Sequence, residues 1–225
     1  KTINYALEKG FTVNLYLEDW SSGMRDSRDY LFGMMDELVK LPIKRFLLPD
    51  TLGILNPLEC VEYMRLMVRR YPDSHFDFHA HNDYDLAVSN SLAAVLSGAK
   101  GLHVTVNGLG ERCGNAPLAS VQVILKDMFH AKTNIKEDRL NDVSRLVEGY
   151  SGIAVAPNTP VVGDNVFTQV AGVHADGDNK DKLYCNDLMP ERFGRHREYA
   201  LGKNSGKANI IQNLNELGLE LTPEQ

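Results

Sequence analysis

Residues 75–83 read His75-Phe76-Asp77-Phe78-His79-Ala80-His81-Asn82-Asp83. The first five alternate polar with aromatic side chains, and a period of two is typical of a β-strand with one polar face. Together with His79, the next four residues bring two imidazoles, an amide and a carboxylate to the end of that strand. We therefore predict a strand over residues 75–79 whose carboxyl end carries functional groups.

Strand-like and helix-like segments alternate over the first 131 residues. Strands are predicted near residues 12–18, 44–48, 75–79 and 102–106, and helices near residues 27–40, 57–70, 84–97 and 117–130. Pro57 and Pro117 stand where a first-turn proline is tolerated, Asn56 is a plausible N-cap, and Gly98 is placed to end a helix. This alternation indicates four βα units around a parallel sheet.

A polar face recurs in three of the four strands. It carries Asn14, Tyr16 and Glu18 in the first strand and His103, Thr105 and Asn107 in the fourth, besides the polar residues of the third. Parallel sheets are normally covered on both faces, so a recurring polar face favours a barrel lumen, with the chemistry at the carboxyl ends of the strands. A doubly wound open sheet remains as the alternative from the pattern alone.

The βα rhythm stops near residue 133. A helix is predicted over residues 137–150, then a proline- and glycine-rich stretch over 153–177, a polar segment, and an amphipathic helix over 207–217. The sequence thus predicts two domains, the second half of a barrel in residues 1–131 and a small mixed α/β subdomain in residues 132–225. Because the chain opens on the tail of a helix rather than on methionine, we expect it to be a fragment.

Composition excludes several classes of protein. The net charge of -6, with 24% charged residues, gives no electrostatic attraction for nucleic acid. Apolar runs fall short of the roughly 20 residues that a membrane span needs, and the N-terminus lacks a signal pattern, so a cytosolic protein is expected. The three cysteines are far apart, which predicts reduced thiols rather than disulfides or a zinc site.

His79 and His81 are the first candidate metal ligands. Two histidines at positions i and i+2 of a strand point to the same side, so both imidazoles can reach one divalent cation. The competing interpretation is a pair of histidines that only form hydrogen bonds in a polar barrel mouth.

A glycine-rich turn at residues 108–115 follows the fourth strand. It presents the carboxylate of Glu111 and the guanidinium of Arg112, and Asn115 could supply an oxygen ligand. The turn lacks the spacing and the ribose-binding acid of a dinucleotide site. Residues 202–207 resemble a P-loop, but three residues separate the two glycines, whereas the motif needs four.

These motifs resemble a known family. The strings HAHND at residues 79–83 and GLGERCGN at residues 108–115 are similar to the motifs of the homocitrate, isopropylmalate and citramalate synthases. Residues 48–53 and 171–177 match further motifs in family order. The resemblance implies a (β/α)8 TIM barrel, a divalent metal held by two histidines and a first-strand aspartate, and a Claisen-type condensation of acetyl-CoA with a 2-oxo acid, followed by thioester hydrolysis. The four units would be strands five to eight, and the first-strand aspartate and the arginine beside it have no counterpart here.

The resemblance also assigns roles to single residues. Glu18 would be the general base, with an orienting carboxylate as the alternative. Thr51 would bind the 2-oxo acid carboxylate, with an ordinary strand-end hydroxyl as the alternative. His174 and Tyr184 match subdomain residues that act on the thioester, often from a second subunit, which implies a homodimer. Two imidazoles plus oxygen suit zinc or manganese, with magnesium or cobalt as alternatives.

Tyr16 bears on the choice of 2-oxo acid. The isopropylmalate synthases carry a small serine two residues before the glutamate, whereas the phenol here would fill the space of a branched side chain. Residues 16–20 and 190–195 also look more like citramalate synthases, so pyruvate is predicted, with 2-oxoisovalerate as the alternative. Two competing functions are that of a metal-dependent barrel lyase or aldolase and that of a non-catalytic truncated paralogue.

Overall fold

The computed structural model describes residues 1–171, 173, 177, 183, 185–203, 205–219 and 222. The chain divides into two compact units, Lys1–Leu125 and Lys126–Gln225. Among the described residues, no helix combines the length and the hydrophobicity that crossing a membrane would take.

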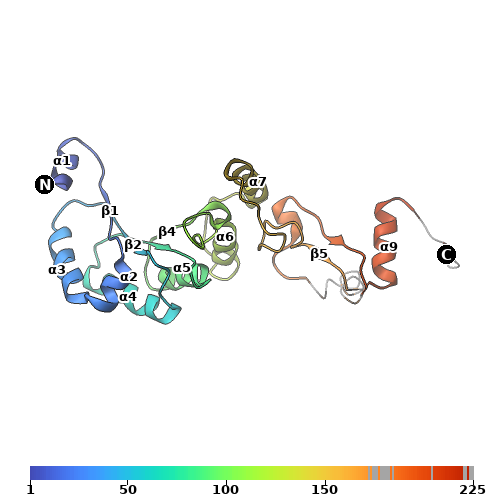
Figure 1. The fold of residues 1–225 in the computed structure, drawn as a ribbon, viewed down its shortest axis with the longest axis horizontal. Coiled ribbons are helices and arrows are strands. Elements are labelled where there is room, and N and C mark those ends of the chain that lie inside the picture. Colours follow the sequence, from blue (N-terminus) through green and yellow to red (C-terminus); the bar gives the residue numbers. More distant parts are fainter. Residues whose placement is uncertain are drawn as a thin grey trace. The chain divides into compact units, whose positions relative to one another are not determined.

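The first unit is built of alternating strands and helices (Figure 1). In chain order they are α1 (Thr2–Glu8), β1 (Asn14–Tyr16), α2 (Trp20–Asp26), α3 (Arg28–Leu38), β2 (Arg45–Asp50), α4 (Pro57–Arg70), β3 (Phe76–Ala80), α5 (Ala87–Leu96), β4 (Gly101–His103), the 3-10 helix η1 (Val106–Gly108) and α6 (Leu118–Asp127). The strands form one parallel sheet in the order β1-β2-β3-β4. The predicted α/β class and the four βα units are confirmed.

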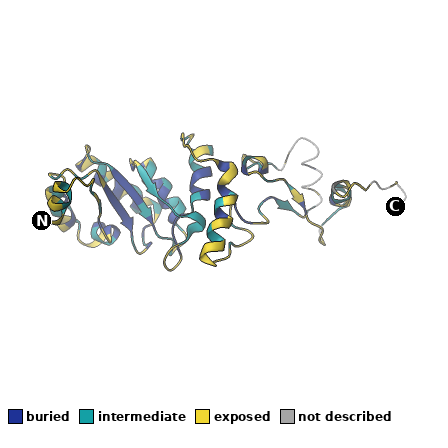
Figure 2. Cartoon of the chain, turned by 90° about the horizontal axis from the view of Figure 1, so that it is seen from above, coloured by how far each residue is buried: buried dark blue, intermediate teal, exposed yellow. Residues whose placement is uncertain are grey.

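One face of the sheet packs against helices. Phe46 pairs in register with Phe76, and Leu48 with Phe78, and all four are buried in a core that they share with side chains of α2 to α5. Figure 2 shows the central strands of this sheet as buried. The opposite face carries the polar series, with Tyr16 in β1, the alternating polar residues of β3 and His103 in β4, as the period of two predicted.

The fourth strand is shorter than predicted. It ends at His103, whereas a strand to residue 106 was expected. The cause is the chain that returns after the glycine-rich turn: Thr105 accepts a backbone hydrogen bond from Leu118 and donates one to Ala116. Asn107 then takes a left-handed conformation (φ 59°), which a strand cannot accommodate. Helix α2, between β1 and α3, was not anticipated either.

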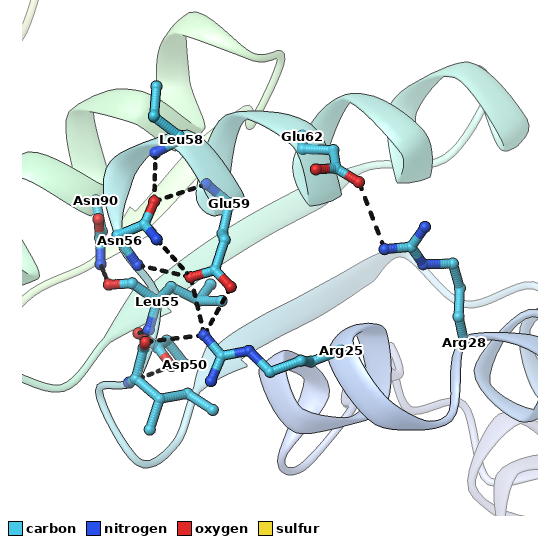
Figure 3. A network of polar contacts seen from close by, with 10 residues as sticks. Arg25, Arg28, Asp50, Leu55, Asn56, Leu58, Glu59, Glu62 and Asn90 are labelled. Carbon is cyan, nitrogen blue, oxygen red and sulfur yellow. Dashed lines mark hydrogen bonds and ion pairs between the residues drawn. The ribbon is translucent and has the colours of Figure 1, made fainter.

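The turn between β2 and α4 is fixed by buried and half-buried polar groups (Figure 3). The carboxylate of Asp50, which is fully buried, accepts hydrogen bonds from the backbone amides of Ile54 at 3.0 Å and Leu55 at 3.1 Å. The buried Asn90 side chain donates to the Leu55 carbonyl at 2.7 Å. Burial raises the pKa of Asp50, and the two backbone amides oppose that rise. The carboxyl end of β2 is therefore held rigidly.

Helix α4 begins with a capping box. The Asn56 side chain accepts from the backbone amides of Leu58 and Glu59, each at 3.0 Å, and the Glu59 carboxylate accepts from the Asn56 backbone at 3.2 Å. Arg25 donates to the same carboxylate at 2.8 Å (Figure 3). The predicted N-cap Asn56 and the first-turn proline are both confirmed.

Replacing Asn56 with alanine is expected to lower the free energy of unfolding by about 1 kcal/mol, because two helix-end amides lose their acceptor. Chemical denaturation of the complete protein measures the effect. Leu58→Ala is the matched control, since the Leu58 side chain is 82% exposed, and should change stability by less than about 0.5 kcal/mol. Equal effects of the two substitutions would contradict the capping role.

The second unit is a small mixed α/β structure. Its described elements are η2 (Glu137–Arg139), α7 (Leu140–Ser151), β5 (Thr168–Gln169), η3 (Pro190–Phe193), β6 (Glu198–Tyr199) and α9 (Lys207–Glu216), with β5 and β6 paired in parallel. Arg192 donates to the buried Glu137 carboxylate at 3.1 Å and to Asp127 at 3.0 Å, and so links η3 to η2 and to Asp127 within this unit. The helices predicted near residues 137–150 and 207–217 are confirmed.

Candidate active site

His79 and His81 lie together at the carboxyl end of β3. The centroids of their rings are 5.1 Å apart, and His79 stands on the polar face, away from the helix-facing Phe78 and Ala80. His81 forms an isolated antiparallel bridge with Asn115, so the glycine-rich turn brings Asn115 beside the histidine pair. The structure thus brings together the three residues proposed as metal ligands.

The hydrogen bonding of His79 leaves one ring nitrogen available. Its Nδ1 lies 3.2 Å from the His103 carbonyl oxygen, which can only accept, so Nδ1 carries the proton and Nε2 the lone pair. Burial lowers the pKa of His79, and the hydrogen bond to the His103 carbonyl offsets that lowering only in part. The ring is therefore neutral at neutral pH. A neutral imidazole with a free Nε2 is the form that binds a metal ion.

Two polar atoms beside His79 are buried without a hydrogen-bond partner among the described residues. They are Nδ1 of His81 and Oδ1 of Asn115. Asn115 itself is held in place, because its Nδ2 donates to the Leu109 carbonyl at 3.0 Å and Gly110 leaves room that any Cβ would fill. Buried lone pairs are costly to leave unsatisfied, so these residues fit a bound cation. The described part of the chain holds no cluster of three His, Cys, Asp or Glu that could bind a metal by itself.

Glu18 is linked to Thr51 at the neighbouring strand end. The Thr51 hydroxyl donates to the Glu18 carboxylate at 2.9 Å and accepts from the backbone amide of Asp19 at 3.0 Å. This hydroxyl has a single hydrogen, which Glu18 occupies, so binding a 2-oxo acid carboxylate would require Thr51 to give up that bond. The hydrogen bond orients the Glu18 carboxylate, and binding of the 2-oxo acid by Thr51 stays a prediction.

Arg112 anchors the glycine-rich turn to the strand ends. Its guanidinium donates to both carboxylate oxygens of Asp83, at 2.7 and 2.9 Å, and to the Thr51 carbonyl at 2.8 Å. The pair holds the pKa of Asp83 below its usual range. Glu111 is exposed in the same turn. No role was predicted for Asp83, although it belongs to the HAHND motif. Its position next to the two histidines of that motif was the sequence signal that could have identified it.

Tyr16 contacts a histidine that the sequence placed on the polar face without assigning it a function. The Tyr16 hydroxyl lies 2.7 Å from Nδ1 of His103, and the Tyr16 ring meets the His79 ring edge-on at a centroid distance of 6.5 Å. Burial, together with the carboxylates of Asp77 and Glu18, raises the pKa of the phenol, so it is protonated at neutral pH. His174 and Tyr184 lie outside the described residues.

Two family models match the chain. Residues 1–147 match the family described as HMGL-like, and residues 161–225 match the one described as Homocitrate synthase post-HMGL domain-like. Two solved structures are similar in fold, both at low sequence identity. HMG-CoA lyase from Bacillus subtilis has a TM-score of 0.60 at 22% identity, and the lyase from Pseudomonas aeruginosa has 0.59 at 21%. Each match covers 68% of this chain and 54% of the other, and shows that the sheet is a fragment of a TIM barrel.

Curated relatives are similar over the whole chain. They include a probable 2-isopropylmalate synthase of Methanopyrus kandleri, 40% identical over 99% of this chain, and a putative (R)-citramalate synthase of the same organism, 37% identical over 100%. A homocitrate synthase of Sulfolobus acidocaldarius is 39% identical over 100% of the chain. The chain spans 44%, 44% and 47% of these relatives. The resemblance predicted from the motifs is confirmed, and the chain belongs to the HMGL-like family.

Proposed function

We propose that the protein to which this chain belongs condenses acetyl-CoA with a small 2-oxo acid. The observation that carries the proposal is the convergence of His79, His81 and Asn115 at one end of a parallel sheet, with Glu18 on the same polar face. The relatives named as isopropylmalate, citramalate and homocitrate synthases support it, since their names share this type of reaction. The two similar solved structures are lyases, but at 22% and 21% sequence identity they support the fold alone.

His79 and His81 would hold a divalent cation, zinc or manganese before magnesium or cobalt, with Asn115 as a further ligand or as a group that orients a water. When bound, such an ion polarises the 2-oxo carbonyl as a Lewis acid. The third protein ligand, an aspartate in the family, would come from the half of the barrel outside this chain.

Glu18 would act as the general base. Its carboxylate takes a proton from the acetyl methyl group, and the carbanion so formed attacks the 2-oxo carbonyl carbon to make the new carbon–carbon bond. The carbonyl oxygen becomes a hydroxyl by taking up a proton. Water then cleaves the thioester and releases free CoA. The Thr51 hydroxyl orients one carboxylate oxygen of Glu18 and leaves the other available to the substrate.

Pyruvate is the proposed 2-oxo acid, so citramalate is the proposed product. The Tyr16 ring stands next to His79, where the substituent of a bound 2-oxo acid would lie. A phenol in this place leaves space for a methyl group rather than for a branched chain. The alternative of 2-oxoisovalerate, which would give isopropylmalate, is favoured by the similarity to the probable 2-isopropylmalate synthase.

The complete protein is expected to release CoA faster with pyruvate than with 2-oxoisovalerate, and Tyr16→Ser should raise relative use of 2-oxoisovalerate by about 10-fold or more, because removing the ring relieves a clash. The measurement is kcat/KM for both acids with acetyl-CoA saturating, read from free CoA. A wild-type protein that prefers 2-oxoisovalerate contradicts the pyruvate assignment. No CoA release with either acid contradicts the condensation and leaves a lyase, an aldolase or a non-catalytic paralogue.

Further parts of the proposal lie beyond the site. His174 and Tyr184 would act on the thioester from a second subunit, which makes the protein a homodimer, and a cytosolic location is proposed for it. The division into residues 1–131 and 132–225 likewise stays a prediction.

A further inference from the structure

Asp77 is a buried carboxylate in the middle of the polar face of the sheet. It is 1% exposed and lies 2.7 Å from Nε2 of His75, 3.3 Å from Nε2 of His103 and 3.3 Å from a guanidinium nitrogen of Arg45. Gly101 is its register partner on β4, and a Cβ at that position would overlap the carboxylate. The Asp77 carboxylate is therefore a fixed hydrogen-bond acceptor beside Nε2 of His103.

The carboxylate fixes which nitrogen of His103 carries the proton. An ionised carboxylate only accepts, so Nε2 of a neutral His103 is protonated and Nδ1 keeps its lone pair. The Tyr16 hydroxyl, 2.7 Å from Nδ1, therefore donates to it. A chain of hydrogen bonds runs from Tyr16 through His103 to Asp77.

This chain of hydrogen bonds is what fixes the Tyr16 ring. The residue is 47% exposed in this chain, on the polar face of the sheet, and its hydroxyl is bonded to Nδ1 of His103. The ring meets the His103 ring edge-on at a centroid distance of 5.8 Å and stands beside His79. Without the bond to its hydroxyl, the side chain would lose the polar contact that favours this rotamer over the others.

We infer that His103, supported by Asp77, is a positioning residue that determines substrate selectivity by holding the Tyr16 phenol against the space for the 2-oxo acid substituent. The inference rests on the proposed function. It differs from the assignment of Tyr16 itself, because it makes selectivity depend on a residue that needs no contact with the substrate.

The test is a double-mutant cycle in the complete protein, with Tyr16→Phe, His103→Ala and the two combined. Tyr16→Phe keeps the volume of the ring and removes only the hydroxyl. Each single substitution should lower the ratio of kcat/KM for pyruvate to that for 2-oxoisovalerate by about 3- to 10-fold, the range expected for one hydrogen bond. The double variant should lower it no further, because both substitutions remove the same bond.

Two more variants separate positioning from general damage to the sheet. His103→Asn places an amide oxygen near the former Nδ1, so it should keep most of the wild-type ratio. His75→Gln alters another group on Asp77 without touching Tyr16 and should leave the ratio unchanged. If His103→Ala does not fold, Tyr16→Phe with His103→Asn still tests the inference.

Additive losses in the cycle, or an unchanged kcat/KM ratio in Tyr16→Phe, overturn the inference. The proposed function still stands in that case if the wild type releases CoA with either acid. A wild type that turns over neither acid overturns both.

Discussion

Replacing Glu18 with glutamine is expected to lower kcat by roughly 100-fold or more and to leave the KM for the 2-oxo acid nearly unchanged. Glutamine keeps the shape of the side chain and an oxygen that can accept from Thr51, but it cannot take up the proton of the acetyl methyl group. The effect should therefore fall on the chemical step. Steady-state release of CoA by the complete protein measures it.

Glu62→Gln is the matched control for this prediction. It makes the same chemical change on the outer surface of α4, at a side chain that is 59% exposed and contacts Arg28 at 3.5 Å. An exposed ion pair of this kind contributes little to stability, so kcat should stay within error of the wild type. A Glu18→Gln variant within a few-fold of wild type would reduce Glu18 to an orienting carboxylate.

The second large effect is expected for His81→Ala, which should lose most of its bound metal and activity while it keeps its fold. Removing a residue that hydrogen-bonds to a metal ligand typically costs about 10- to 100-fold in metal affinity, and removing a ligand itself should cost more. The buried Nδ1 of His81 lacks a partner among the described residues, so removing the ring removes a polar atom that is placed to bind a cation.

Elemental analysis after dialysis, with circular dichroism as the check on folding, measures this prediction. His196→Ala is the matched control, since it removes an imidazole whose side chain is 82% exposed. Metal content should then match the wild type. Stoichiometric metal in a folded His81→Ala variant would remove His81 from the ligands and favour the alternative in which the histidine pair only forms hydrogen bonds.

Local pattern was sufficient for most of the first unit. The period-two alternation placed β3 and the polar face, and the asparagine before α4 and the proline at its first position placed the start of that helix. These features depend on neighbours within one turn or one strand, so they can be read from the chain. Helix α2 was missed because it is only seven residues long, and β4 was drawn too long because its end depends on hydrogen bonds to the returning chain at Ala116 and Leu118.

In the candidate site, too, some contacts follow from the sequence and the others depend on the tertiary structure. The nearness of His79 and His81 follows from their spacing on one strand, which holds whatever the fold around them. The partners of Tyr16, Glu18 and Arg112 do not follow from spacing. They are His103, Thr51 and Asp83, which stand 87, 33 and 29 positions away in the chain. Such pairs depend on the register between strands and on the path of the glycine-rich turn, because a shift of one residue would turn each side chain to the opposite face of the sheet.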